Sequence, residues 1–195
     1  MKEVLELVNT LVENVPGVGR KNATRIILTF LKKQKTLMPH FGQMLIDFSK
    51  ELKSCKSCNN ISKNEICSIC EDEKRDETQI CVVETLNELM NFEKARLKCK
   101  YFILGEDFFD QVLKNEIFIK PLISRIQNLK LEEVIIALNT TIAGQTNLFF
   151  LDEVIKKQRP ELKITTLSRG IPVGTQIDYI DEITIKQAFD ARTEI

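Results

Sequence analysis

The chain has 195 residues, 43% of them hydrophobic and 29% charged, and its 28 basic side chains are balanced by 28 acidic ones. This composition excludes a disordered chain, and the zero net charge argues against a protein that coats nucleic acid. Without a signal peptide or an apolar stretch of membrane-spanning length, the sequence predicts a cytoplasmic protein of two or three small modules.

Residues 1–53 have the apolar spacing of amphipathic helices. Apolar side chains recur at helical intervals over residues 4–12, 26–31 and 37–52. Pro16 and Gly17 interrupt the pattern between the first two segments. We therefore expect a small helical domain over residues 1–53.

The turn between the first two predicted helices has the form of a helix-hairpin-helix motif, Val15-Pro16-Gly17-Val18-Gly19-Arg20-Lys21. Gly17 and Gly19 allow backbone conformations that other residues avoid, so the turn and the next helix can present N–H groups to a phosphate. Residues 14–46 include no acidic residue and carry the candidate DNA-binding cations Arg20, Lys21 and Arg25. The motif predicts salt-sensitive, sequence-independent contact with the DNA backbone. An ordinary interhelical turn and a hairpin that contacts protein are alternative interpretations.

Four cysteines in the next segment form two closely spaced pairs. Cys55-x-x-Cys58 is followed after eight residues by Cys67-x-x-Cys70. Two such turns supply the four sulfur ligands of a closed, tetrahedral zinc site, which has a structural and not a catalytic role. We expect one zinc ion per chain and a finger over residues 54–77. Cys81 and Cys99 lie in or beside apolar runs and are interpreted as small buried side chains.

From residue 78 onward, short β-rich runs alternate with helical segments. The runs are expected at residues 80–83, 101–104, 134–137 and 162–165, and the helices around residues 86–97, 121–129 and 146–157. This alternation predicts βαβ units, with a parallel sheet covered by helices over residues 78–167. A C-terminal segment, 168–195, follows. The predicted fold is therefore α/β with several modules.

Ligands of such a sheet bind at the carboxyl ends of its strands. Glu84 follows the first predicted strand, and Glu106 and Asp107 follow the second. A magnesium-dependent phosphoryl-transfer site needs several carboxylates there, but the third strand is followed by Asn139 and Thr141. The sequence therefore predicts no catalysis, although a magnesium-dependent enzyme with an incomplete acidic set remains the alternative.

Taken in order, these motifs resemble the RecR family of recombination mediators over essentially the whole chain. The resemblance rests on the hairpin at residues 15–21, the four-cysteine finger, the segment 69–84, and the C-terminal run Ser168-Arg169-Gly170-Ile171-Pro172-Val173-Gly174 with its acidic continuation. It implies a Toprim-type sheet without enzymatic activity, and a dimer or tetramer that closes into a ring around DNA. It also implies cooperation with RecO, RecF or both in loading RecA onto gapped DNA, and hence a nucleoid-associated location.

The resemblance also assigns roles to individual residues. Lys21 and Arg25 correspond to DNA-contacting positions of the family, and Glu84 to the Toprim glutamate. The acidic run near Asp178 and Asp181 resembles a Walker B element without a phosphate loop.

The sequence departs from the family at two acidic positions. Ala143-Gly144-Gln145 replaces the usual Glu-Gly-Glu, and acidic residues replace a Ser-Pro loop after the second strand. If other acids compensate for these missing positions, the candidate partner-binding residues are Glu84, Glu106 and Asp107. If they do not, RecF is the expected main partner. A protein adaptor without DNA binding is a further alternative.

Overall fold

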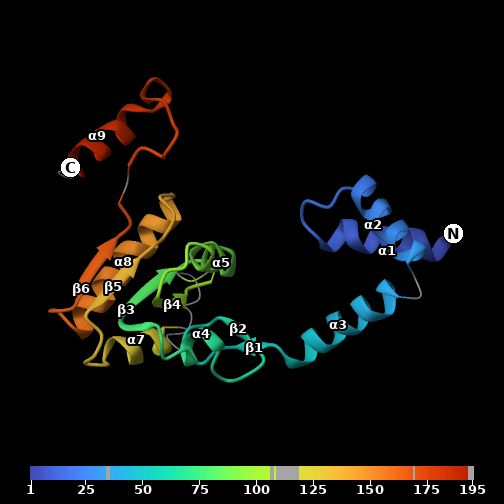
Figure 1. Ribbon diagram of the computed structural model, residues 1–195, viewed down its shortest axis with the longest axis horizontal. Helices are drawn as coiled ribbons and strands as arrows, with labels where there is room; N and C mark the ends of the chain where they lie inside the picture. Colours follow the sequence, from blue (N-terminus) through green and yellow to red (C-terminus); the bar gives the residue numbers. More distant parts are fainter. Residues whose placement is uncertain (34–35, 106–107, 109–118, 169, 193–195) are drawn as a thin grey trace. The chain divides into compact units, whose positions relative to one another are not determined.

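The computed structural model describes residues 1–33, 36–105, 108, 119–168 and 170–192 (Figure 1). The chain forms two compact units, Met1–Leu52 and Lys53–Ile195. None of the helices in these ranges combines the length and the apolar character that a membrane crossing requires.

The first unit consists of the three helices that the apolar spacing predicted: α1 (Lys2–Asn14), α2 (Arg20–Lys32) and α3 (Leu37–Glu51). Val8 of α1 packs against Ala23 and Ile27 of α2, and these three side chains are buried. The ring of Phe30 stacks on Phe41 of α3, with 5.2 Å between the ring centroids. Helix α3 itself has no buried residue.

The second unit begins with the cysteine-rich segment. Strands β1 (Lys53–Ser54) and β2 (Ile61–Ser62) form a two-stranded antiparallel ribbon, and α4 (Ser68–Glu71) is a single helical turn. The buried cluster of this segment consists of cysteines, flanked by Ile66 and Ile69. An apolar core of this size is too small to hold a fold by itself.

A parallel sheet of four strands follows, as the sequence predicted. Its strands are β3 (Asp76–Val83), β4 (Cys99–Ile103), β5 (Glu133–Ile136) and β6 (Lys163–Thr166), in the order β4-β3-β5-β6. Strand β3 begins earlier than expected because Asp76 pairs with Cys99, before a shift of register that ends at Ile80. The strand order reverses between β3 and β5, which is where open parallel sheets place their ligands.

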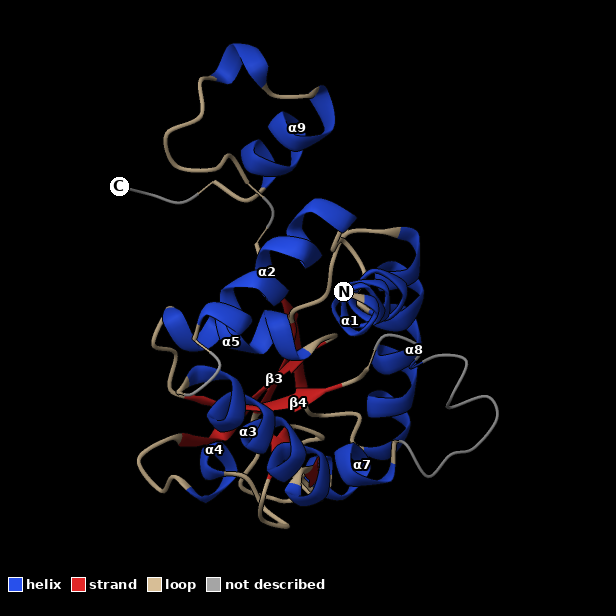
Figure 2. Ribbon diagram, turned by 90° about the vertical axis from the view of Figure 1, so that its right-hand side faces the viewer, coloured by secondary structure: helices blue, strands red, loops and turns tan. Residues whose placement is uncertain are grey.

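Helices cover both faces of the sheet (Figure 2). Helices α7 (Lys120–Ile126) and α8 (Ile142–Gln158) bury Leu122, Ile126 and Leu151 against one face. Helix α5 (Leu86–Lys94) buries Leu89 against the other face, where Cys81 and Cys99 lie buried as predicted. Helix α8 begins earlier than expected because the Thr141 side chain caps it and accepts a hydrogen bond from the Gly144 N–H.

The C-terminal segment contains two helical elements that the sequence analysis did not predict, a 3-10 turn at Ile177–Tyr179 and α9 (Glu182–Asp190). Asp181 caps α9, because its carboxylate accepts hydrogen bonds from the backbone N–H and the hydroxyl of Thr184. These bonds lower the pKa of Asp181. In this chain, one acid of the Walker-B-like run is therefore a helix cap.

Gly144 gives a direct test of the tight connection between β5 and α8. A Cβ added at this position would collide with the carbonyl oxygen of Asn139. We predict that Gly144→Ala lowers the free energy of unfolding by about 3 kcal/mol, because the colliding atom belongs to the backbone and cannot rotate away. Urea denaturation followed by circular dichroism measures this change.

The matched control is Gly42→Ala in α3, where nothing lies within 4 Å of an added Cβ. This change should raise stability by about 0.5–1 kcal/mol, as alanine does inside helices. Equal stability of the Gly144 variant and the parent would contradict the close approach of α8 to Asn139.

Candidate functional site

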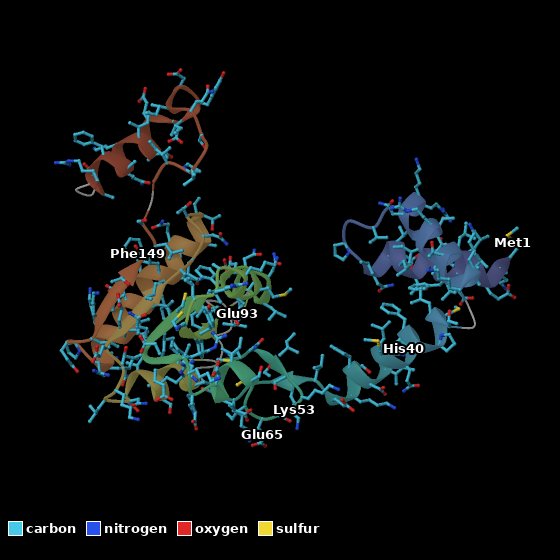
Figure 3. All side chains as sticks on the ribbon, in the orientation of Figure 1. Met1, His40, Lys53, Glu65, Glu93 and Phe149 are labelled. Atoms are coloured by element: carbon cyan, nitrogen blue, oxygen red, sulfur yellow. The ribbon has the colours of Figure 1, made fainter. Side chains whose placement is uncertain are left out.

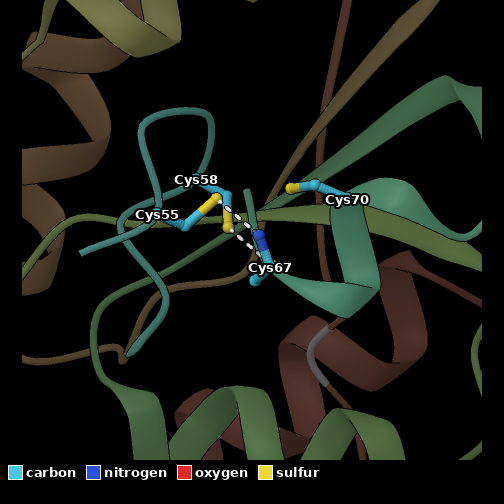
Figure 4. Close-up of side chains that lie close together, drawn as sticks. All are labelled: Cys55, Cys58, Cys67 and Cys70. Carbon is cyan, nitrogen blue, oxygen red and sulfur yellow. Dashed lines mark hydrogen bonds between the residues drawn. The ribbon is translucent and has the colours of Figure 1, made fainter. Parts of the chain in front are cut away.

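The four paired cysteines converge at one point (Figure 4). Their sulfur atoms all lie within 4.8 Å of one another. Cys55, Cys58 and Cys67 are buried, and Cys70 is half-buried on α4. The Cys58 and Cys67 sulfurs share a hydrogen bond of 3.5 Å, and the Cys67 backbone N–H donates to the Cys55 sulfur at 3.3 Å. The spacing of the sequence thus produces a closed cluster of sulfur atoms.

The geometry and chemistry of this cluster fit a zinc ion. With a Zn–S distance of about 2.3 Å, tetrahedral ligands lie roughly 3.8 Å apart, close to the observed separations. The hydrogen bond between Cys58 and Cys67 lowers the pKa of Cys67 and raises that of Cys58. A bound zinc ion would supply structural stability and no open coordination position.

The zinc finger is attached to β4, which is an edge strand of the sheet. The Ile103 N–H donates to the carbonyl of Cys58 at 2.9 Å, and the Asn59 side-chain amide donates to the Ile103 carbonyl at 3.0 Å. Asn59 adopts a positive φ of 61°, which asparagine tolerates better than most residues. These bonds satisfy backbone groups that an edge strand would otherwise leave unpaired.

Two cations lie beside the sulfur cluster. Lys100 of β4 is only 4% exposed, and its ammonium group donates to the carbonyls of Ile69, Cys70 and Asp72 at 3.3, 2.8 and 2.7 Å. Arg125 of α7 donates to the Tyr101 carbonyl at 2.6 Å, and burial lowers the pKa of Arg125 while the four cysteines act in the opposite direction. With zinc and four thiolates carrying a formal charge of about −2, these two cations balance the site.

The predicted hairpin lies between α1 and α2. Gly17 adopts a φ of +79°, which a residue with a side chain rarely does, and the Val18 N–H donates to the Val15 carbonyl at 3.1 Å. Gly19 is the N-cap of α2 and has no side chain to bond the first N–H groups, and no acidic residue occupies the first turn. The start of α2 can therefore offer its N–H groups and its dipole to an anion.

The hairpin cations differ in their surroundings. The guanidinium of Arg20 donates to the Asn9 side chain at 3.0 Å and ties α2 to α1. Lys21 and Arg25 are exposed one turn apart on α2, and within the described ranges neither side chain forms an ion pair. Their charges are free for an external anion.

Glu84, Glu88 and Asn139 meet at the carboxyl ends of β3 and β5, where the strand order reverses. The Asn139 amide donates to Glu84 at 3.3 Å and to Glu88 at 2.6 Å. The second carboxylate oxygen of Glu88 accepts from the N–H groups of Glu84 and Thr85 in a capping box. Asn139 thus occupies the space between the carboxylates as a donor, whereas a divalent cation would require further oxygen ligands.

The sequence-based candidates and the residues of the structure differ at several positions. Glu106 and Asp107 lie outside the described residues, and His40, the one histidine of the sequence, is exposed on α3 (Figure 3). Sequence analysis missed Glu88, although Thr85 followed by Glu88 is a capping-box pattern. It also missed Lys100, whose signal is a single charge within an otherwise apolar strand.

Three segments of the chain match family models. Residues 52–72 match the four-cysteine zinc finger domain of RecR, residues 78–168 match a Toprim domain, and residues 170–193 match the C-terminal region of RecR. The recombination protein RecR of Chloroherpeton thalassium is 33% identical to this chain, and the similarity covers 100% of both chains. The chain belongs to the RecR family.

Other relatives agree in name and in length. The recombination protein RecR of Bacteroides thetaiotaomicron is 35% identical over 92% of this chain and 88% of its own. That of Erythrobacter litoralis is 34% identical over 100% of this chain and 98% of its own. Membership of the family places this chain in recombinational DNA repair, and the finger model together with the sulfur cluster identifies one zinc site per chain.

We predict that Cys67→Ser abolishes stoichiometric zinc binding and destabilises the second unit, because a structural zinc site supplies folding free energy directly. The parent protein should contain one zinc ion per chain in elemental analysis, and the variant much less. Cys81→Ser is the matched control, since Cys81 is buried in the sheet and outside the sulfur cluster. Full zinc occupancy and parent-like stability of the Cys67 variant would contradict the assignment.

Proposed function

We propose that this chain is a non-enzymatic recombination mediator that binds single-strand/double-strand junctions or gapped DNA through its helical hairpin. In this proposal it forms a ring-like clamp, a dimer or a tetramer, and acts with RecO, RecF or both to help load RecA. The observation that carries the proposal is the uncapped, acid-free start of α2, with Lys21 and Arg25 exposed beside it. Four domains, 1–53, 54–77, 78–167 and 168–195, are part of the same proposal.

The hairpin favours DNA over a purely protein ligand. Gly17, Gly19 and the first N–H groups of α2 suit one phosphate, and Lys21, Arg25 and the more constrained Arg20 add positive charge around it. Contacts of this kind are made to the backbone, so they do not depend on base sequence.

An absence of catalysis is supported by the contacts of Asn139. Its amide group donates to both Glu84 and Glu88, so these carboxylates are engaged by a neutral donor. With Asn139 and Thr141 in the place of acids, the alternative of a magnesium-dependent Toprim enzyme lacks ligands. We propose instead that Glu84 contacts a basic partner, together with Glu106 and Asp107, as in an electrostatically guided protein interface.

Assembly into a ring is supported by exposed apolar side chains in both units. On α3, Met44, Leu45 and Ile46 are 44–57% exposed, and in the C-terminal segment Tyr179, Ile183 and Phe189 are 66–82% exposed. Apolar groups of this number are usually covered in an assembly, and the occupant we propose is a second copy of the chain. Several hairpins facing one channel would bind DNA multivalently.

We predict that Lys21→Ala combined with Arg25→Ala strongly reduces the affinity for gapped DNA. Loss of two phosphate contacts per chain should reduce the slope of log affinity against log salt by about 2 per engaged chain, and the losses multiply in an assembly. Fluorescence anisotropy across a salt series measures both quantities.

Lys32→Ala combined with Lys33→Ala serves as the control for this experiment, because it removes the same charge at the opposite end of α2. Zinc content and assembly mass should stay at parental values in both variants. Unchanged affinity and an unchanged salt slope of the first variant would instead support the adaptor alternative.

We predict that the parent protein shows no magnesium-dependent strand cleavage or primer synthesis, and that Glu84→Gln leaves DNA binding unchanged. If Glu84 contacts a basic partner, the same substitution should weaken the complex with RecO or RecF by about tenfold. Turnover by the parent that disappears in Glu84→Gln would overturn the non-enzymatic proposal.

A further inference from the structure

A cavity of about 380 Å³ opens at the amino-terminal edge of the sheet, at the opposite ends of the strands from Glu84. Three segments form it: the approach to β3, the end of α5, and the loop that leads into β4. Its lining residues include Lys74, Arg75, Glu93, Arg96 and Lys98. Glu93, labelled in Figure 3, marks its position. Neither the zinc centre nor the hairpin uses these side chains.

The charges that line the cavity fall into two groups. Arg75 forms a bidentate ion pair with Glu93, at 2.8 and 2.6 Å, and lies 3.4 Å from the carboxylate of Asp72. The two acidic residues of the lining are therefore both paired with Arg75. The hydrogen bonds to Glu93 raise the pKa of Arg75. Lys74, Arg96 and Lys98 are exposed and form no ion pair with any described residue. The cavity thus presents three uncommitted cations.

The backbone of Arg96 is held in a costly conformation. Arg96 follows the C-cap of α5 with a φ of +58°, and its N–H donates to the Glu93 carbonyl at 3.0 Å. Glycine is the usual residue at this position of a helix end, because a Cβ is unfavourable in the left-handed region. Backbone strain of this kind is concentrated at ligand sites, where the side chain that causes it contributes to binding.

We propose that this cavity binds phosphate groups of a single strand of nucleic acid, held by Lys74, Arg96 and Lys98. The proposal rests on the DNA-binding function proposed above and adds a second contact site on a different unit of the chain. Lysine and arginine neutralise phosphates without reading sequence, and the planar guanidinium of Arg96 can in addition bind two phosphate oxygens or stack on a base. Leu97, 42% exposed in the same lining, offers apolar surface beside the cations.

The cavity favours a phosphate strand over an acidic peptide because the guanidinium of Arg96 can stack on a base as well as bind a phosphate. Glu71 and Glu73 are exposed on the adjoining loop outside the lining, and they repel any extended polyanion equally. A cavity of this size accepts one or two phosphate groups, and a flexible single strand can adjust its backbone to bring neighbouring phosphates to the three cations.

Arg96→Gly is the decisive substitution because it removes the backbone strain and the positive charge together. If Arg96 binds phosphate, the variant should be more stable than the parent and bind nucleic acid more weakly. Removing the strain should raise the thermal midpoint of unfolding by about 2–4 °C. Removing the charge should at the same time weaken the binding of a dT20 oligonucleotide about threefold and reduce the salt slope by about 0.7. The triple variant Lys74→Ala, Arg96→Gly, Lys98→Ala should reduce the slope by about 2 and the affinity at low salt by at least tenfold.

The charge-matched control is the triple variant Lys53→Ala, Lys157→Ala, Lys186→Ala, which removes three exposed cations outside the cavity. Both triple variants are measured on the full-length, zinc-loaded protein, with zinc content and assembly mass as folding controls. Failure of the parent to bind dT20 or gapped DNA would overturn the DNA-binding function itself. Binding by the parent with equal losses in the two triple variants would overturn the cavity site alone.

Two further probes decide which anion occupies the cavity. Inorganic pyrophosphate should compete with dT20 for the parent only at millimolar concentration, and polyglutamate should not compete at the same charge concentration. Tight pyrophosphate binding without any effect of the triple variant on dT20 would assign the cavity to free phosphate. Preferential loss of polyglutamate binding in the triple variant would assign it to an acidic peptide, and either result overturns the proposal.

Discussion

The attachment of the zinc finger to strand β4 is the interaction on which the second unit depends. An edge strand exposes a row of unpaired N–H and C=O groups, and proteins must cover it or risk pairing with other chains. Here the Ile103 N–H donates to the Cys58 carbonyl, and the Asn59 side-chain amide donates to the Ile103 carbonyl. The finger has almost no apolar core besides its cysteines, so its shape depends on the metal. Zinc therefore stabilises the sheet edge as well as the finger.

The buried cations and the negatively charged zinc site stabilise each other. Lys100 is buried without a carboxylate contact among the described residues, and burying an uncompensated cation costs several kcal/mol. The negative charge of zinc with four thiolates offsets that cost, and Lys100 with Arg125 offsets the cost of burying the thiolates. Because the ammonium group of Lys100 also bonds three carbonyls around α4, the same side chain joins the finger to the sheet mechanically.

Sequence alone predicted the three N-terminal helices, the four-cysteine cluster and the parallel sheet, because each follows from a periodic or closely spaced pattern. It did not predict α9, whose Ile183 and Phe189 are exposed and leave no clear buried stripe. Lys100 and Arg125 were missed for a different reason. Their role arises only when β4, α7 and the finger come together, and no local spacing encodes contacts over 24 to 31 positions of the chain.

Because the strands are parallel, their carboxyl ends all lie along one side of the sheet, the carboxyl edge, and their amino ends along the opposite side, the amino edge. These two sides differ chemically. The carboxyl edge presents Glu84 and Glu88, joined by Asn139, and repels phosphate. The amino edge presents Lys74, Arg96 and Lys98 around a cavity whose acids Arg75 already neutralises. The two ends of the sheet thus present side chains of opposite charge, which suits the basic partner proposed at Glu84 and the phosphate strand proposed at the cavity. Under the two proposals, a basic protein at Glu84 and a nucleic-acid strand at the cavity would therefore contact different residues and would not compete with each other.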